Sequence, residues 1–352
     1  MNKKVFAILA EPASYTIDRN ANVYDKLDIK YCYIHSSSLA KSEFEQDIEP
    51  LDKLTDKELS TFLSKVLKEN DIIILNGTRT RVGLILLRLN KKFRRVIGLD
   101  SDGQLNIPFN PIKRIVKYMF YHNLYRKTYI YGLAGGSFTH KDAFRHYGMP
   151  EERIFLSPMM VNNGKFAYHQ TRGGNKFTFL YVGRIVAVKN IELMIKAFLM
   201  KFRDNGNVEL RIVGTGDLLV KLREEYDFNK NVLFEGAKYG NNLIEAYRAA
   251  NVFVLPSSFE PWGLVVNEAM CAGMPVIVSN QVGAAWDLVK DRNTGFIFQY
   301  NDAMELACRM AEIYENKQLY SKYSENAYDT MMNYWNYDLY RTNLESFINS
   351  AQ

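Results

Sequence analysis

Short, mostly apolar runs alternate with amphipathic stretches along the chain. A run that is apolar on both alternating faces is typical of a strand buried in a parallel sheet. The stretches between the runs carry apolar residues at helical spacing, as in 57–69. Strands that alternate with helices predict an α/β fold with parallel sheets. The expected strands are 5–10, 29–35, 71–77, 95–100, 177–182, 209–213, 232–236, 252–255 and 276–278.

The alternation restarts near the middle of the chain. Turn-rich stretches at 162–165 and 171–175 separate the strand runs of the first half from those of the second. A chain of 352 residues, 47% of them hydrophobic, is long enough to bury two cores. We therefore expect two domains, 1–165 and 166–335.

One segment of the second half combines a helix start with two carboxylates. After the expected strand 252–255 comes a turn, and then an apolar helical stretch that ends at Gly273. Glu260 lies in the turn and Glu268 about one turn into the helix. Unpaired N–H groups at a helix start favour an anion such as phosphate, whereas two carboxylates repel phosphate and suit sugar hydroxyls. The combination indicates a nucleotide sugar as the ligand.

The spacing of Glu260 and Glu268 resembles the Glu-x7-Glu motif of the family-4 retaining glycosyltransferases. The flanking residues also match this family, namely Pro256-Ser257, Gly263-Leu264, Glu268-Ala269-Met270 and Gly273-x-Pro275-Val276-Ile277. The resemblance is dense in the second half and covers the first half in outline. It implies a GT-B fold, with two Rossmann-like βαβ domains facing across a cleft. It also implies that a last helix, about 336–352, packs back on the N-terminal, acceptor-side domain.

The resemblance implies roles for individual residues of the second domain, which would hold the nucleotide sugar. Arg184 and Lys189 would neutralise the leaving diphosphate and Glu260 would hold the donor sugar, which makes these three the candidate catalytic residues. The alternative role of Glu260 is that of a covalent nucleophile, as in retaining glycosidases. The candidate donor-binding residues are Gly183, Gly214, Tyr239, Gly263, Leu264 and Glu268.

In the first half, polar residues follow two expected strands. Asn76 ends one of them, and Asp100 and Asp102 stand at the end of the next. Ligands of parallel sheets collect at the carboxyl ends of the strands, so these three are acceptor-side candidates. The sequence Asp100-Ser101-Asp102 spells Asp-x-Asp, which we interpret as a turn rather than a metal site because the second half already supplies cations for the diphosphate. We expect no metal and no cofactor.

The loop after the first strand departs from the family. Relatives commonly have a glycine-rich loop there that approaches the donor diphosphate, whereas this chain has Glu11-Pro12-Ala13-Ser14-Tyr15. Without a glycine, a close approach of this backbone to a diphosphate is not expected.

The net charge of +6 comes from an excess of basic residues in the first half of the chain, because the second half is slightly acidic. The window 79–127 holds 12 basic residues and only two acidic ones. Within it, 111–127 predicts a helix with an apolar stripe beside Lys113, Arg114 and Lys117. Such a helix is either a core helix under a solvated basic face or a surface that meets an anionic membrane.

Further features predict a protein of the cytoplasm, in solution or peripheral at the inner face of the plasma membrane. The N-terminal apolar run is too short for a signal peptide, and no run approaches a membrane-spanning length. Three cysteines, an odd number without metal-ligand spacing, indicate reduced thiols. The expected partners are a nucleotide sugar and a glycan or lipid-linked acceptor, and not nucleic acid.

Three functions are compatible with these residues. The first is a metal-independent retaining glycosyltransferase of bacterial surface polysaccharide synthesis. A sugar-nucleotide epimerase with the same fold would release nucleotide without an acceptor alcohol, and a non-catalytic sugar-binding protein would not turn over. The sequence leaves the donor base and the donor sugar open.

Overall fold

The computed structural model describes residues 3–36, 50–168 and 175–351. The chain divides into two compact units, Met1–Met160 with Tyr337–Gln352 and Val161–Asn336. The division falls before the expected boundary at 165/166, because Asn163 already belongs to the second unit, where its amide donates to the carbonyl of Trp335 at 3.0 Å. Of the expected linker, residues 171–174 lie outside the described residues.

The first unit is built on a six-stranded parallel sheet with the strand order β2-β1-β3-β4-β5-β6. Its strands are β1 (Val5–Leu9), β2 (Lys30–Tyr33), β3 (Ile72–Asn76), β4 (Val96–Ser101), β5 (Ile130–Ala134) and β6 (Ile154–Leu156). Its helices are α1 (Ser14–Arg19), α2 (Asp56–Glu69), α3 (Arg81–Phe93), α4 (Pro111–Tyr125), α5 (Thr139–His146) and α13 (Tyr337–Ser350). β1 and β5 are buried at every position, as expected of parallel strands.

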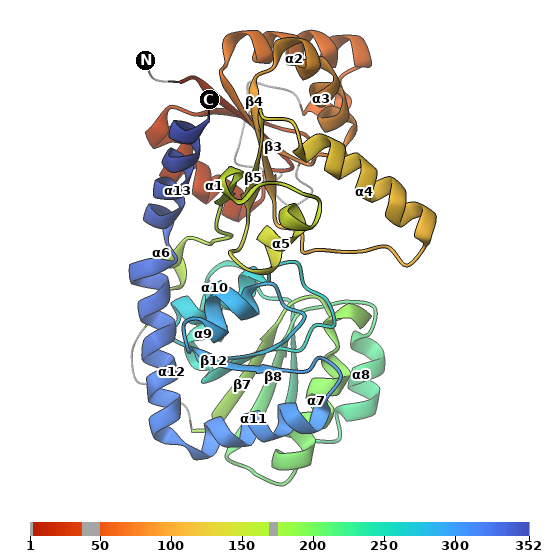
Figure 1. Cartoon of the computed structure of the whole chain (residues 1–352). Helices are drawn as coiled ribbons and strands as arrows, with labels where there is room; N and C mark the ends of the chain where they lie inside the picture. The colour runs from red at the N-terminus through yellow and green to blue at the C-terminus, as the bar shows by residue number, and fades with distance from the viewer. Residues whose placement is uncertain (1–2, 37–49, 169–174, 352) are drawn as a thin grey trace. The chain divides into compact units, whose positions relative to one another are not determined.

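Helices cover both faces of this first sheet. On one face, Ile97 and Leu99 of β4 belong to the same apolar core as residues of α2 and α3, and these two helices lie side by side (Figure 1). Residues alternate between the faces of a strand, so Gly98 faces the other side. There an added Cβ would lie 2.8 Å from the ring of Phe347 in α13. The missing side chain therefore lets the C-terminal helix approach the sheet.

The second unit is also built on a six-stranded parallel sheet, with the strand order β12-β11-β10-β7-β8-β9. Its strands are β7 (Phe177–Val182), β8 (Val208–Val213), β9 (Val232–Gly236), β10 (Val252–Leu255), β11 (Val276–Ser279) and β12 (Gly295–Phe298). Its helices are α6 (Asn163–Phe166), α7 (Ile191–Phe202), α8 (Leu219–Tyr226), α9 (Gly240–Ala249), α10 (Leu264–Cys271), α11 (Ala303–Glu315) and α12 (Lys317–Asp329). α7 and α11 lie side by side (Figure 1). The expected α/β architecture with parallel sheets is confirmed in both units.

Each sheet has a crossover, where the chain changes the side to which it adds strands. In the first unit the crossover lies between β1 and β3, and in the second unit between β7 and β10. The connections on either side of such a point run over opposite faces and leave a crevice at the carboxyl ends of the two strands, where ligands of α/β proteins bind. The residues that follow these four strands are therefore candidate ligand contacts.

Two local features differ from the expectation. The segment after β1 is not only a loop, because α1 begins at Ser14. β4 continues to Ser101, so Asp100 and Ser101 lie in the strand and not in a turn. The strand continues because both residues still pair with β5, where Asp100 lies opposite Leu133.

Candidate functional site

The crossover of the second sheet brings together charged side chains from two loops. Lys189 lies in the loop after β7 and Glu260 in the loop after β10, and their side chains form an ion pair. Each side chain keeps 15% of its surface exposed. The fold therefore joins two of the three candidate catalytic residues directly.

Backbone hydrogen bonds hold this ion pair in place. The N–H of Glu260 donates to the carbonyl of Gln281 at 3.1 Å, and the Glu260 carbonyl accepts from the N–H of Gly283 at 3.0 Å. The N–H of Ser258 donates to the carbonyl of Val188 at 2.8 Å, which ties the two loops to each other. The backbone positions of the two loops are thus fixed before a ligand arrives, as a preorganised site requires.

Arg184, the third candidate, directly follows the β7–Gly183 turn and is exposed. Tyr181 of β7 donates a hydrogen bond to the Arg184 carbonyl at 2.9 Å. The pKa of Tyr181 is raised, first by burial and then by the charge of Glu260, whereas Arg184 acts in the opposite direction. Tyr181 therefore lies close to both charged groups. Its place in an apolar strand gives no sequence signal that separates it from a core aromatic residue.

The start of α10 adjoins Glu260. Gly263, which precedes the helix, has a φ of +97°, a backbone conformation that favours glycine. A Cβ at this position would lie 3.3 Å from Cγ of Glu260. In the described part of the chain no side chain caps the first turn, which begins at Leu264. The N–H of Val266 donates to the carbonyl of Gly263 at 2.8 Å, so the N–H groups of Leu264 and Val265 are the ones available to an anion beside the ion pair.

Glu268 lies one turn further into α10 and is largely buried. Tyr247 of α9 donates a hydrogen bond to Oε2 of Glu268 at 2.6 Å. Burial raises the pKa of Glu268 to about 7, although the hydrogen bond from Tyr247 lowers it. The pKa of Tyr247 is raised well above its usual value, by burial and by the charge of Glu268. Glu268 therefore changes its charge near neutral pH, and Tyr247 is a contact that the sequence pattern does not reveal.

The loops after β7 and β8 approach each other at two glycines. The N–H of Gly183 donates to the carbonyl of Val213 at 3.0 Å. A Cβ on Gly214 would lie 1.8 Å from the carbonyl oxygen of Gly183. Any side chain at Gly214 would therefore push the two loops apart, and with them the turn that carries Arg184.

Tyr239 is a donor-side candidate with no visible link to this cluster among the described residues. It precedes α9 and is 74% exposed. In the regions that the structure describes, no hydrogen bond or ion pair joins its side chain to Arg184, Lys189 or Glu260. Its expected contact with the donor stays a prediction.

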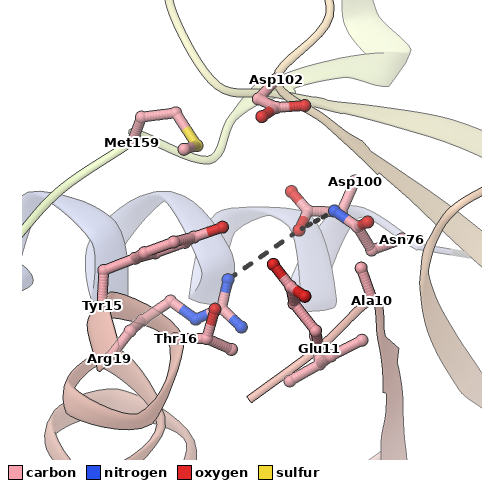
Figure 2. A pocket seen from close by; sticks show the side chains of 10 residues that line it. Ala10, Glu11, Tyr15, Thr16, Arg19, Asn76, Asp100, Asp102 and Met159 are labelled. Carbon is pink, nitrogen blue, oxygen red and sulfur yellow. Dashed lines mark hydrogen bonds and ion pairs between the residues drawn. The ribbon is translucent and has the colours of Figure 1, made fainter. Parts of the chain in front are cut away.

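The crossover of the first sheet holds a cavity of about 220 Å³. All three acceptor-side candidates line it, namely Asn76, Asp100 and Asp102 (Figure 2). The remaining polar lining comes from the loop after β1 and from α1, and includes Glu11, Tyr15 and Arg19. These three were not predicted, because α1 shows no clear helical pattern in the sequence.

A second ion pair lies in this cavity. Arg19 of α1 approaches Oδ2 of Asp100 to 3.9 Å, as the dashed line in Figure 2 shows. Asp100 also accepts hydrogen bonds from the Ser157 hydroxyl at 3.0 Å and from the Asn76 amide at 3.4 Å. Burial raises the pKa of Asp100, and Arg19, Ser157 and Asn76 oppose the rise. Asp100 therefore anchors Arg19 and is not a free carboxylate.

The Asp-x-Asp sequence does not place its two carboxylates in one cluster with a third ligand. Figure 2 shows Asp102 apart from the Arg19–Asp100 pair. Among the residues that the structure describes, no group of three or more His, Cys, Asp or Glu side chains is arranged to hold a metal ion. Metal independence of the reaction stays a prediction.

α4 exposes the apolar side chains that a core helix would bury. Asn110 caps its first turn, accepting a hydrogen bond from the N–H of Lys113 at 3.0 Å. Yet Ile112 is 71% and Val116 61% exposed, and Phe109 in front of the helix is entirely exposed. In Figure 1 this helix, drawn in gold, stands out from the rest of the first unit. α4 is therefore not an ordinary core helix under a basic face.

Other apolar side chains extend this exposed surface, which we call the α4 surface. It consists of the exposed apolar residues Ile107, Phe109, Ile112, Ile115, Val116 and Met119 and the basic residues Lys113, Arg114 and Lys117. A patch of this kind marks an interaction site more often than a solvated face. None of the helices in the described ranges has the length and apolar character needed to cross a bilayer.

Two Rossmann-like units, each built on a parallel sheet, are typical of the GT-B fold. The crystal structure of Anabaena Alr3699/HepE in complex with UDP superimposes with a TM-score of 0.78 over 99% of this chain and 100% of that chain. The two sequences are only 16% identical, so this likeness shows the fold alone.

The sequence comparisons narrow this class. The family model described as "Glycosyl transferases group 1" matches residues 167–330, just under half of the chain. The Staphylococcus aureus protein named "Capsular polysaccharide biosynthesis glycosyltransferase CapM" is 31% identical over 203 residues, 56% of this chain and 52% of that protein. The Escherichia coli protein named "UDP-Gal:alpha-D-GlcNAc-diphosphoundecaprenol alpha-1,3-galactosyltransferase" is 32% identical over 208 residues, 53% of each chain. The chain spans about half the length of these curated relatives. The matches support a glycosyltransferase of the GT-B class.

Proposed function

We propose that this protein is a retaining glycosyltransferase that moves a sugar from a nucleotide-diphosphate sugar to a glycan or lipid-linked acceptor, in the synthesis of a bacterial surface polysaccharide. The observation that carries the proposal is the cluster of Arg184, Lys189 and Glu260 beside the start of α10, at the crossover of a Rossmann-like sheet. Two cations and a helix start suit a diphosphate, and carboxylates suit sugar hydroxyls. The UDP in the structural neighbour and the names of the two relatives support the same substrates.

In the proposed reaction, the bond between the anomeric carbon of the donor sugar and the diphosphate oxygen breaks. The acceptor hydroxyl attacks on the same face, so the sugar keeps its anomeric configuration. Negative charge grows on the leaving diphosphate, where Arg184, Lys189 and the N–H groups at Leu264 would stabilise it without a metal. The acceptor proton passes to the leaving phosphate oxygen, and no separate base is needed.

In this proposal Glu260, in the loop before α10, and Glu268, in α10 itself, bind different parts of the donor. Glu260 holds Lys189 in the free protein and would accept hydrogen bonds from the donor sugar once Lys189 turns to the diphosphate. Glu268 would accept hydrogen bonds from the ribose hydroxyls.

We further propose that the α4 surface attaches the protein to the anionic cytoplasmic leaflet, where a lipid-linked acceptor would lie. A helix that inserts apolar side chains and surrounds them with Lys and Arg suits an anionic lipid surface. A protein partner would leave the basic residues without an evident use. The exposure of Phe109, Ile112 and Val116 supports this part of the proposal.

The decisive experiment incubates the full chain with a panel of nucleotide sugars, with and without a lipid-linked acceptor, and measures nucleotide release. Release that depends on the acceptor supports a transferase, and NMR of the product then shows whether the configuration is retained. Release without any acceptor supports an epimerase or hydrolase. Binding without release supports a sugar-binding protein, and either of these results contradicts the proposal.

A further inference from the structure

The loop Glu11–Tyr15 and α1 have no role in the proposed donor chemistry. They nevertheless build one side of the cavity at the crossover of the first sheet, to which Glu11, Tyr15 and Thr16 all contribute. Thr16 is only 6% exposed, so this side is a packed wall and not a loose surface. A volume of about 220 Å³ lies below the roughly 300–1,000 Å³ of pockets for drug-sized ligands. The cavity therefore suits a single sugar ring.

The charge of Arg19 is not available to a ligand in this cavity. Asp100 lies 3.9 Å from the guanidinium, and each of the two side chains keeps only 11% of its surface exposed. The guanidinium carbon also lies 4.7 Å from the ring centroid of Tyr24 and 5.6 Å from that of Tyr340. A guanidinium held in this way has its charge matched and its planar face covered. Arg19 thus shapes the cavity without attracting a phosphate or carboxylate to it.

Two other carboxylates reach the cavity without a matching cation. Glu11 and Asp102 both line it, and both are exposed to solvent. Within the described ranges, no Lys or Arg forms an ion pair with either of them. Figure 2 shows them on different sides of the cavity. Carboxylates in this position accept hydrogen bonds from hydroxyl groups and attract an ammonium group, whereas they repel an anion.

We infer that this cavity binds the terminal sugar of the acceptor and selects a neutral or amino sugar over one that carries a carboxylate or phosphate. Glu11 and Asp102 accept hydrogen bonds from the sugar hydroxyls, while the Arg19–Asp100 pair keeps the cavity open between them. The inference rests on the proposed function, since it makes this cavity the acceptor side of a transferase. It also explains why the loop after β1 differs from the glycine-rich loop of the family, because a glycine-rich loop would not supply the carboxylate of Glu11.

The test compares three octyl glycosides that share one hexose frame, those of N-acetylglucosamine, glucosamine and glucuronic acid. Their binding to the full chain is titrated by saturation-transfer NMR without any donor. We expect the first two to bind and the glucuronide to bind at least about 10-fold more weakly, which corresponds to about 1.4 kcal/mol. Because no donor is present, this result does not depend on transfer. A failure of the proposed function appears separately, in the nucleotide-release assay.

Variants assign the selectivity to the two carboxylates. In Glu11→Gln/Asp102→Asn the preference against the glucuronide should shrink to a few-fold, and Glu11→Gln alone should give an intermediate ratio. Both side chains are exposed, so the fold is expected to tolerate the amides. Glu152→Gln, at an exposed position of the same unit outside the cavity lining, is the matched control and should keep the parent ratio. Equal binding of the glucuronide by the parent, an unchanged ratio in the double variant, or no binding of any of the three overturns the inference.

Discussion

The crossovers of the two sheets each hold an ion pair, but in different surroundings. In the second unit the pair lies beside the start of a helix that no side chain of the described residues caps. In the first unit the pair lines a cavity that two further carboxylates also line. Lys189 and Glu260 keep 15% of their side-chain surfaces exposed, and Arg19 and Asp100 keep 11%. Glycines bring the loops after β7 and β8 close together in the second unit, whereas in the first unit a helix follows β1. In our proposals the same topological position binds a diphosphate in one unit and a neutral or amino sugar in the other. In these proposals the residues of the segments that follow the strands determine which ligand binds, whereas the order of the strands does not.

Removing the cations of the second crossover should have the largest effect, and it tests whether this crossover holds the diphosphate. We expect Arg184→Ala and Lys189→Ala each to lower turnover by about 10²-fold or more, the usual scale for one stabiliser of transition-state charge. Lys201→Ala, at an exposed position of α7, is the matched control and should keep parent activity. Nucleotide release at saturating donor measures the effect. If both site variants stay within a few-fold of the parent, the second crossover does not hold the diphosphate.

The basic charge of the first unit provides the next test. We expect the parent to sediment with anionic vesicles at low salt and to be released at high salt, because salt screens the attraction. Each basic residue near such a surface contributes about 1 kcal/mol, so the variant Lys113/Arg114/Lys117→Glu should bind at least about 10²-fold more weakly. Vesicle sedimentation at both salt concentrations measures this.

A matched charge reversal on the second unit controls for the change in net charge. Lys201, Lys230 and Lys322 are all exposed, and Lys201/Lys230/Lys322→Glu should sediment nearly as well as the parent. A parent that stays in the supernatant at low salt, or an α4 variant that sediments equally well, would remove the membrane role of the α4 surface. The transferase proposal would remain.

The pH dependence of Glu268 sharpens the account of the donor side. Burial raises its pKa from 4.5 to about 7, and ribose hydroxyls donate to the ionised form. The affinity for a nucleotide sugar should therefore rise about tenfold per pH unit below pH 7 and level off above it. Folding has the opposite sign: because the folded pKa lies above the unfolded value, the stability from this group is present below about pH 4.5 and is lost as the pH rises through about 7. Calorimetric titration with a nucleotide sugar, whose doubly esterified diphosphate does not titrate here, measures the affinity.

Two variants separate Glu268 from other titrating groups. Glu268→Gln cannot ionise, so it should bind the nucleotide sugar weakly and without this pH dependence. Tyr247→Phe removes the hydrogen bond that lowers the pKa of Glu268, so the midpoint of the affinity curve should move to higher pH. An affinity of the parent that does not change between about pH 6 and 8 would contradict the assigned role of Glu268.

Chelation should have the smallest effect. We expect EDTA to leave turnover within a few-fold of the untreated enzyme, because Arg184 and Lys189 supply the positive charge that a metal would bring to the diphosphate. The assay is the same nucleotide release, before and after dialysis against EDTA. A strict requirement for Mg²⁺ or Mn²⁺ would instead make Asp100 and Asp102 candidate ligands, and Asp102→Asn should then abolish the activation by metal.

The features that could be predicted from the sequence are those that depend on residues close to one another along the chain. Buried parallel strands appear as apolar runs, and all the expected strands occur in the two sheets with small shifts of their ends. Glu260, Gly263 and Glu268 could be identified because they lie within nine positions of one another, so their spacing is itself the signal. The helix 111–127 could be identified for the same reason, from its local periodicity.

The contacts of these residues could not be predicted from local patterns, because the partners come from distant parts of the chain. The family resemblance placed Lys189 in the same site as Glu260, but it did not predict their ion pair. Lys189 meets Glu260 across 71 positions, and Tyr247 meets Glu268 across 21. Which loops meet is set by the order of the strands in the sheet, and that order is not written in any local pattern. Arg19 belongs to the same class, since its pairing with Asp100 depends on the place of β1 beside β3 and of β3 beside β4.

α4 shows most clearly what the sequence alone could not predict. Its sequence determined an amphipathic basic helix with an apolar stripe that includes Ile112 and Val116. The same pattern is compatible with a buried stripe and with an exposed one, because periodicity reports which residues share a face and not what covers that face. Only the tertiary structure decided that the stripe is exposed, since burial depends on whether another element of the fold packs against it.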